Sequence, residues 1–180
     1  MSGFLYAFLA VLLAGVGARD QALVAQIVLA QRACGPLLAA ALLAAFATTA
    51  LAGTSASRLL ADFAPPARGI FAGLALVLAG AEMLFWPAPR PPAEPTRSLF
   101  AAFVVLFAQQ LTDAARFLVL ALGIATAAPL PAALGGAAAS AAMLTAGWAM
   151  PEIVTEPRTR IVRRMGGIAI LFIGLWKFIG

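Results

Sequence analysis

The sequence contains no histidine and a single cysteine, and charged residues make up only 11% of its 180 positions. Zinc, haem and iron–sulfur sites of the usual kinds are therefore excluded, and Cys34 cannot form a disulfide within the chain. No nucleophile with an adjacent base and no phosphate-binding loop is present, so an enzyme is not expected. No cofactor is expected either, and any metal site would have to be built from oxygen ligands.

Hydrophobic residues, by contrast, make up 63% of the chain, and its mean hydropathy is +1.00. This composition predicts an all-α integral membrane protein whose main partner is the lipid bilayer. The net charge of +5 would suggest a nucleic-acid partner in a soluble protein. Here the basic residues fall mainly between apolar segments, so we interpret them as topology signals and expect no nucleic acid.

Six apolar segments are long enough to cross about 30 Å of hydrocarbon. Between the third and the fourth lies the stretch PAPRPPAEPTR, which is too rich in proline for a helix and is typical of an exposed tether. We therefore expect a first three-helix unit at 1–86, a linker at 87–97 and a second three-helix unit at 98–180. The six expected segments are 3–31, 36–57, 68–86, 98–127, 130–150 and 162–179.

The two units repeat one another. Asp20 and Pro36 in the first unit correspond, at the same offset along the chain, to Asp113 and Pro129 in the second. When one inserted residue is allowed for, Gly73 and Gly80 correspond to Gly167 and Gly174. An odd number of crossings forces the second copy to enter the bilayer upside down, which predicts an inverted-topology repeat. The alternative is that alanine-rich apolar sequences align by chance.

The basic residues between segments predict the orientation, because cytoplasmic loops are enriched in arginine and lysine. The linker is then cytoplasmic, both termini lie outside, and the expected location is the inner (plasma) membrane. The cytoplasmic set is Arg32, Arg90, Arg97, Arg158, Arg160, Arg163 and Arg164, against Arg58, Arg68 and Lys177 on the other side.

Asp20 and Asp113 lie inside long apolar segments, where an ionised carboxylate is costly and marks a pathway or binding site. A straight helix over 3–31 would exceed the bilayer by roughly 10 Å, so a break near 15–20 is expected. Because the two copies are inverted, the aspartates would be displaced to opposite faces of one central cavity, an arrangement suited to alternating access.

The residues around the two aspartates are compatible with a structural role as well as with a binding role. Gln110 is three residues from Asp113, which on one helix predicts an oxygen-lined face. Arg19 adjoins Asp20, and Arg116 is one turn beyond Asp113, so each carboxylate has a basic partner within reach. Such pairs can also serve only to lock helices together or to reach the headgroups.

Other residues have simpler interpretations. Glu82, near the end of its segment, is expected at the membrane interface, and the three tryptophans are expected to be interfacial anchors. The hydroxyls of Ser140 and Thr145 can bond to preceding backbone carbonyls in a packing interface. The repeated glycines, seven residues apart in each unit, predict faces where helix backbones approach closely.

The chain resembles a family of divalent cation exchangers of Golgi, chloroplast and bacterial membranes. The resemblance is carried by the spacing from Asp20 to Arg32, by the following Gly-Pro and apolar helix, and by the segments AQQLTDAARF and GGIAILFIGLWKF. It implies two inverted three-helix halves and export of manganese or calcium in exchange for protons, with no other metal or cofactor.

The family's motif, E-x-G-D-[KR]-[TS], occurs once per half, and in both copies here only the aspartate is retained. The resemblance implies that Asp20 and Asp113 bind the cation, with Gln110 in the place of a glutamate. The motif positions are Gly17, Arg19, Asp20, Gln21 and Ala22 in the first copy, and Gln110, Thr112, Asp113, Ala114 and Ala115 in the second. Arg19, Gln21, Thr112 and Arg116 are expected to support the site.

Two alternatives remain open. Paired arginine and aspartate would accommodate a zwitterion or an anion better than a bare dication, because the arginines neutralise the carboxylates. Loss of both motif glutamates also permits a non-transporting membrane subunit. Homodimerisation through the small-residue faces, or pairing with a more complete homologue, is a further expectation.

Overall fold

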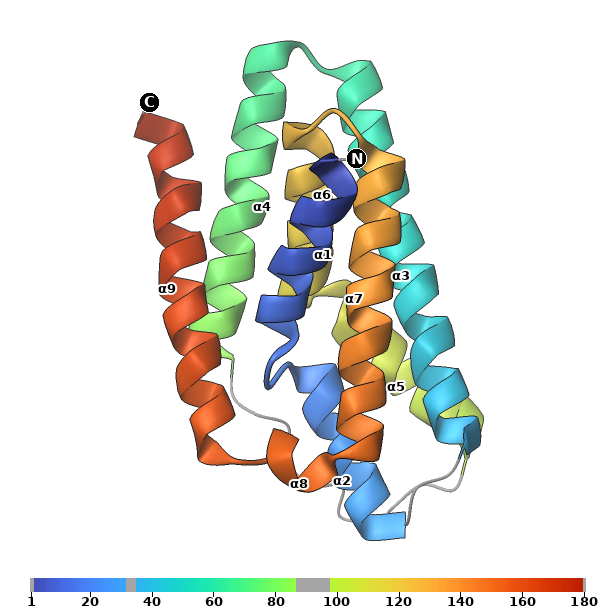
Figure 1. Cartoon of the computed structure of the whole chain (residues 1–180). Coiled ribbons are helices and arrows are strands. Elements are labelled where there is room, and N and C mark those ends of the chain that lie inside the picture. Colours follow the sequence, from blue (N-terminus) through green and yellow to red (C-terminus); the bar gives the residue numbers. More distant parts are fainter. Residues whose placement is uncertain (1, 32–34, 87–97, 180) are drawn as a thin grey trace.

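The computed structural model describes residues 2–31, 35–86 and 98–179, and all regular structure within these ranges is helical (Figure 1). The expected linker with Arg90 and Arg97 lies outside the described residues, as do Arg32 and Cys34. The helices are α1 (Ser2–Gly15), α2 (Arg19–Gln31), α3 (Gly35–Asp62), α4 (Pro65–Phe85), α5 (Leu99–Leu111), α6 (Ala114–Ala125), α7 (Pro129–Ala149), α8 (Pro151–Val154) and α9 (Pro157–Ile179).

Within the described residues, three helices are long and apolar enough to span a membrane, and the number rises to five if each of two bent helix pairs counts as one span. Helices α3, α4 and α7 each qualify alone, and the pairs α1 with α2 and α5 with α6 qualify as bent spans. The all-helical prediction is thus confirmed. The sixth expected segment, 162–179, falls within α9, which is not among the candidate spans. Its apolar run is flanked by Arg163, Arg164 and Lys177, which raise the cost of crossing hydrocarbon.

In both bent spans, a residue at the break stabilises the interruption of the helix. The first bends by 51° between Gly15 and Arg19, where Gly17 adopts a φ of +67° that is strained for other residues. This confirms the expected break near 15–20. The second bends by 49° at Thr112 and Asp113, where the Asp113 side chain caps α6. Both breaks lie part-way through the bundle and not at its ends (Figure 1).

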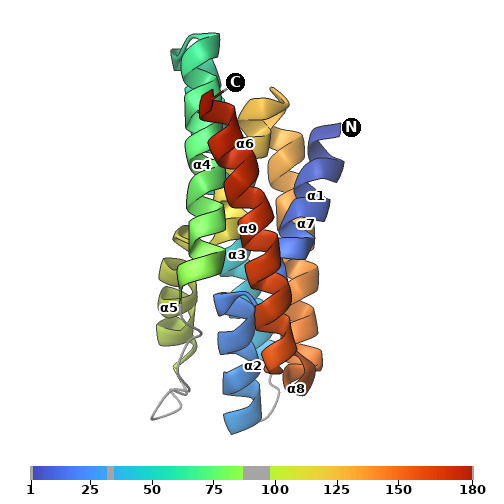
Figure 2. The same ribbon diagram turned by 90° about the vertical axis from the view of Figure 1, so that its left-hand side faces the viewer.

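Helices α4 and α9 run antiparallel and pack along most of their length (Figures 1 and 2). Their repeated glycines form the contact. A methyl group added at Gly80 would lie 2.8 Å from the carbonyl oxygen of Gly167, and one added at Gly73 would lie 3.4 Å from that of Gly174. The predicted close approach of backbones at these glycines is therefore confirmed, and it joins the last helix of each expected unit.

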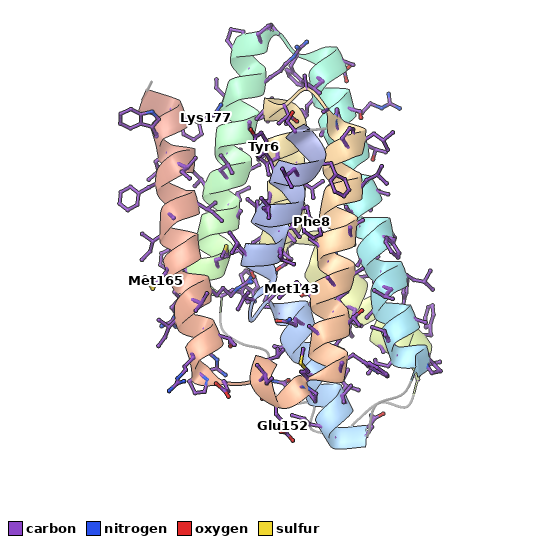
Figure 3. All side chains as sticks on the ribbon, in the orientation of Figure 1. Tyr6, Phe8, Met143, Glu152, Met165 and Lys177 are labelled. Atoms are coloured by element: carbon purple, nitrogen blue, oxygen red, sulfur yellow. The ribbon has the colours of Figure 1, made fainter. Side chains whose placement is uncertain are left out.

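The remaining helices form a bundle around the breaks. Helix α7 packs against α1 and α3, α5 packs against α3, and α6 packs against α3, α4 and α7. Small residues again permit the contact, since a methyl group on Gly135 would collide with the backbone carbonyl of Phe4. Both termini lie at the end where α3 joins α4, whereas α8 lies at the other end (Figure 1). Figure 3 accordingly shows Glu152 and Lys177 toward opposite ends.

Candidate functional site

The two helix breaks and the packing of α4 and α9 bring six charged side chains into the interior. Each is at most 7% exposed, and the set is Arg19, Asp20, Glu82, Asp113, Arg116 and Arg163. Three guanidinium groups and three carboxyl groups give a formal charge of zero when all are ionised. A buried charge is tolerated only with partners, so the contacts of each group decide what the site can do.

Asp20 lies in the first turn of α2, immediately after the first break. Its Oδ1 accepts a hydrogen bond from the backbone N–H of Gln21 at 2.8 Å, and its Oδ2 accepts one from Nε2 of Gln110 at 3.1 Å. Within the described part of the chain, no ion pair to Asp20 is recorded. Asp20 and Gln110, two of the predicted site residues, are thus in contact, although they come from different expected units and were not predicted to pair.

Asp113 is the N-cap of α6, where its Oδ2 accepts from the backbone N–H of Ala115 at 3.3 Å. Its Oδ1 lies 3.4 Å from Nη2 of Arg163. The prediction that Gln110 and Asp113 share one helical face was wrong, because the helix ends at Leu111 and restarts at Ala114. Gln110 instead points across the break toward Asp20.

Glu82, which was expected at the membrane interface, is 6% exposed and belongs to this buried cluster. Its Oε1 lies 2.7 Å from Nε of Arg19, which makes an ion pair, but the geometry does not meet that of a hydrogen bond. Its Oε2 accepts a hydrogen bond from Arg163. Arg163 also donates to the carbonyl of Ala14 at the end of α1. This arginine was expected only as a cytoplasmic topology signal, and it is in fact a buried partner of two carboxylates.

Arg116 does not form the expected salt bridge with Asp113. Its Nε donates to Oγ1 of Thr48 at 2.8 Å, and its Nη1 donates to Oγ of Ser140 at 3.0 Å. Its Nη2 is buried without a hydrogen-bond partner. The capping geometry of Asp113 turns that carboxylate back onto the first turn of α6, which leaves Arg116 free to reach α3 and α7. Ser140 therefore holds a charged group and is more than a packing residue.

The supporting residues tie the two breaks together. Nη2 of Arg19 donates to the carbonyl and the hydroxyl of Thr112, at 3.0 and 3.2 Å, and its guanidinium lies 4.5 Å above the ring of Trp86. Gln21 accepts from the backbone N–H of Gly17 at 2.9 Å and donates to the carbonyl of Met143 at 2.9 Å. Figure 3 shows Met143 beside the first break. Arg19 and Gln21 thus position the breaks relative to their neighbours.

A small cavity lies between the two aspartates. Its volume is about 10 Å³, and Asp20, Asp113, Arg116 and Ser140 supply its polar lining. A cavity of this size has room for about one water molecule. Asp20 and Asp113, expected to be metal ligands, therefore face one space. Within the described residues, no group of three or more Asp, Glu, His or Cys side chains could hold a metal ion.

Two larger cavities are lined in part by arginines of the buried cluster. One, of about 160 Å³, lies between α3 and α6 and shares Arg116 in its lining. The other, of about 200 Å³, is lined by Arg19 and Arg163 together with residues at the end of α4 and the start of α9. Arg116 thus lines both the central cavity and the first of these cavities, and Arg163, which lines the second, contacts Asp113.

Comparison with known proteins identifies no relative: no protein-family model, no curated protein and no solved structure matches this chain.

Sequence reasoning missed Glu82, Arg163 and Thr48 as members of the site. For Glu82 a signal was present, since it lies in the apolar stretch LVLAGAEMLFW and a carboxylate inside such a stretch points to a functional position. Arg163 has no comparable signal, because its neighbours Arg160 and Arg164 make it look like part of a basic loop.

Proposed function

We propose that this protein is a secondary transporter in which Asp20 and Asp113 form a central, alternately accessible site. One observation carries the proposal: two broken, apolar helix pairs place two carboxylates on one cavity inside the bundle. Broken helices with polar groups at membrane depth are the usual construction of transporter binding sites. A purely structural ion-pair network would not require a cavity between the acids.

The proposed architecture is six spans in two inverted halves, with α9 as the sixth. Three features support it. Both halves start with a bent span that carries an aspartate at the break, and the two bends differ by only 2° (51° and 49°). The last helices, α4 and α9, are antiparallel. Their glycines also pack in matching pairs, with Gly80 of α4 against Gly167 of α9 and Gly73 of α4 against Gly174 of α9.

The flanking arginines provide a way to open each side in turn. Arg116 lines both the central cavity and the cavity between α3 and α6, and Arg163, which lines the cavity beside α4 and α9, contacts Asp113. Withdrawal of one arginine would connect the centre to one side, while the other arginine keeps the second side closed. This is the requirement of alternating access.

Two candidate cargoes follow from different observations. The resemblance and the shared cavity of Asp20 and Asp113 support a divalent cation, manganese or calcium, exchanged for protons. The three buried arginines support a zwitterion or a small anion. A dication needs about six oxygen ligands and excess negative charge, whereas this site is balanced and already contains the Arg116 guanidinium. In the conformation described, the geometry therefore favours the zwitterion or anion.

Transport by the purified protein in liposomes tests the proposal. Uptake of manganese, calcium, inorganic anions and a panel of amino acids would be measured under an imposed proton gradient. We expect flux of one class above that of empty liposomes, and at least tenfold loss of that flux in Asp20→Asn and Asp113→Asn. Asp62→Asn, which removes an exposed carboxylate at the end of α3, is the matched control and should retain flux.

The two cargoes are separated by Gln110→Glu, which places a carboxylate at the motif position and 3.1 Å from Asp20. If the cargo is a dication, the variant binds manganese more tightly, because the added charge offsets ion desolvation. If the cargo is a zwitterion or anion, its flux falls. Absence of any flux in the wild-type protein would contradict the transporter proposal and favour the non-transporting subunit.

A further inference from the structure

The cavity of about 200 Å³ beside α4 and α9 has an unusual lining. Four of its lining residues are arginines, and none is acidic; the complete lining is Gly17, Arg19, Met83, Trp86, Arg160, Arg163 and Arg164. We call it the arginine cavity. It is distinct from the central cavity between the two aspartates, although Arg163 reaches toward both.

The nearby carboxylates do not neutralise this cavity. Glu82 is buried behind it, with one oxygen on Arg19 and the other on Arg163. Arg160 and Arg164 are exposed, and in the described part of the chain no ion pair is recorded for either of them. At least two guanidinium charges therefore face the cavity without a counter-charge. Like charges held this close repel one another, and a bound anion would relieve that repulsion.

The spacing of three arginines on α9 places them on one face of that helix. Arg160, Arg163 and Arg164 are three and four residues apart, so they lie on one helical face. Arg163 is fixed by its bonds to Glu82 and Ala14, and it anchors this face against the bundle. Guanidinium groups bind phosphate oxygens through paired, charge-assisted hydrogen bonds, which makes such a face suited to a tetrahedral oxyanion.

Trp86 indicates where along the membrane normal this cavity lies. The residue ends α4, is 58% exposed, and its ring lies under the Arg19 guanidinium. An exposed tryptophan at the end of an apolar helix is typical of the headgroup level. Basic pockets between helices at this level bind lipid phosphates.

We propose that the arginine cavity binds a phosphate-type oxyanion, the chemistry shared by an anionic phospholipid headgroup and free inorganic phosphate. Arg160 and Arg164 supply the uncompensated charge, and Arg19 and Arg163 form the inner wall. The site does not depend on the proposed transport, so a protein without transport activity would still bind the oxyanion.

Binding is tested with the full-length protein in phosphate-free, lipid-free detergent. The shift in thermal unfolding temperature would be titrated with inorganic phosphate and, separately, with phosphatidylglycerol, using phosphatidylcholine as the control for lipid without net charge. The test variant is Arg160→Gln with Arg164→Gln. The matched control, Arg58→Gln with Arg158→Gln, also removes two exposed positive charges, but neither residue lines the cavity.

We expect phosphatidylglycerol or inorganic phosphate to stabilise the wild-type and control proteins, with apparent affinity at least tenfold weaker in the test variant. Response to phosphatidylglycerol alone identifies a lipid headgroup as the ligand, and response to phosphate identifies a site open to soluble anions. If neither stabilises the protein, or if test and control variants weaken binding equally, the proposal is overturned. Should the double variant fail to fold, Arg164→Gln alone gives the same comparison against Arg158→Gln.

Discussion

At the scale of single residues, the partners of each buried charge matter more than the number of charges. Glu82 bridges Arg19 and Arg163, so it neutralises charges from α2 and α9 at one point. Asp20 is held by an amide and a backbone N–H instead of a cation. Asp20 is therefore the carboxylate of the site most able to exchange its partner for a solute or a proton.

The first residue-scale prediction concerns Glu82→Gln. The amide keeps the shape of the side chain but leaves two buried arginines without their shared carboxylate, so we expect a loss of about 3 kcal/mol in the free energy of unfolding. Denaturant unfolding in detergent measures it. Glu152→Gln, at an exposed glutamate of α8, is the control and should change stability by less than about 0.5 kcal/mol. Equal effects of the two substitutions would show that the bridge does not stabilise the fold.

A second prediction separates the two roles of Asp113. Its side chain caps α6 and also contacts Arg163. Asn keeps the cap and removes the charge, whereas Ala removes both, so Asp113→Ala should be less stable than Asp113→Asn by about 1 kcal/mol. Both should lack transport, since each lacks the carboxylate. Equal unfolding free energies would mean that the cap does not support the second break.

At the scale of elements, the glycine contact holds α4 and α9 together. An added methyl group at Gly80 would lie 2.6 Å from the backbone nitrogen of Leu171. Backbone cannot move aside as a side-chain end can, so the helices would have to separate. Because Glu82 lies on α4 and Arg163 on α9, separation would also pull apart the ion pair at the site.

We therefore predict that Gly80→Ala destabilises the protein by about 1–3 kcal/mol through overpacking. Gly69→Ala on the same helix is the matched control, because nothing lies within 4 Å of its added methyl group. There the higher helix propensity of alanine should stabilise by about 0.5–1 kcal/mol. Opposite signs in thermal unfolding support the packing role, and a shared sign would contradict it.

The sequence predicted several elements well. The break after Gly15 followed from segment length, and the close approach of backbones followed from glycines seven residues apart, whereas the pairing of α4 with α9 was not predicted. The second break was not predicted, because the segment AQQLTDAARF contains no glycine or proline and its apolar flanks suit a continuous helix. There the Asp113 cap offsets the cost of ending one helix and starting another.

At the scale of the whole molecule, the proposed topology places the end of α3 and the short helix α8 on opposite sides of the membrane. Helix α4 and the following spans separate the C-terminal end of α3 from α8, and these two points lie at opposite ends of the bundle (Figure 1). Because the start of α9 is basic, we expect the α8 end on the cytoplasmic side.

Cysteine labelling tests this topology. In a Cys34→Ser background, which removes the sole cysteine, single Asp62→Cys and Glu152→Cys variants provide exposed thiols at the two ends. A membrane-impermeant maleimide added to intact cells with a permeable outer membrane should label the first and not the second. Inside-out vesicles should reverse the pattern. Labelling of both thiols from one side would contradict a crossing between them.

The sequence by itself determined that this protein is helical and apolar enough to span a membrane, and it identified Asp20 and Asp113 as its costly intramembrane acids. These properties depend on composition and local spacing, which are the same however the helices pack against one another. Only the tertiary structure decided that Glu82 and Arg163 belong to the site and that Arg116 bonds to Thr48 and Ser140. Partner choice among buried charges depends on which helices pack together, because a guanidinium can pair only with the carboxylate that the fold brings within a few ångströms.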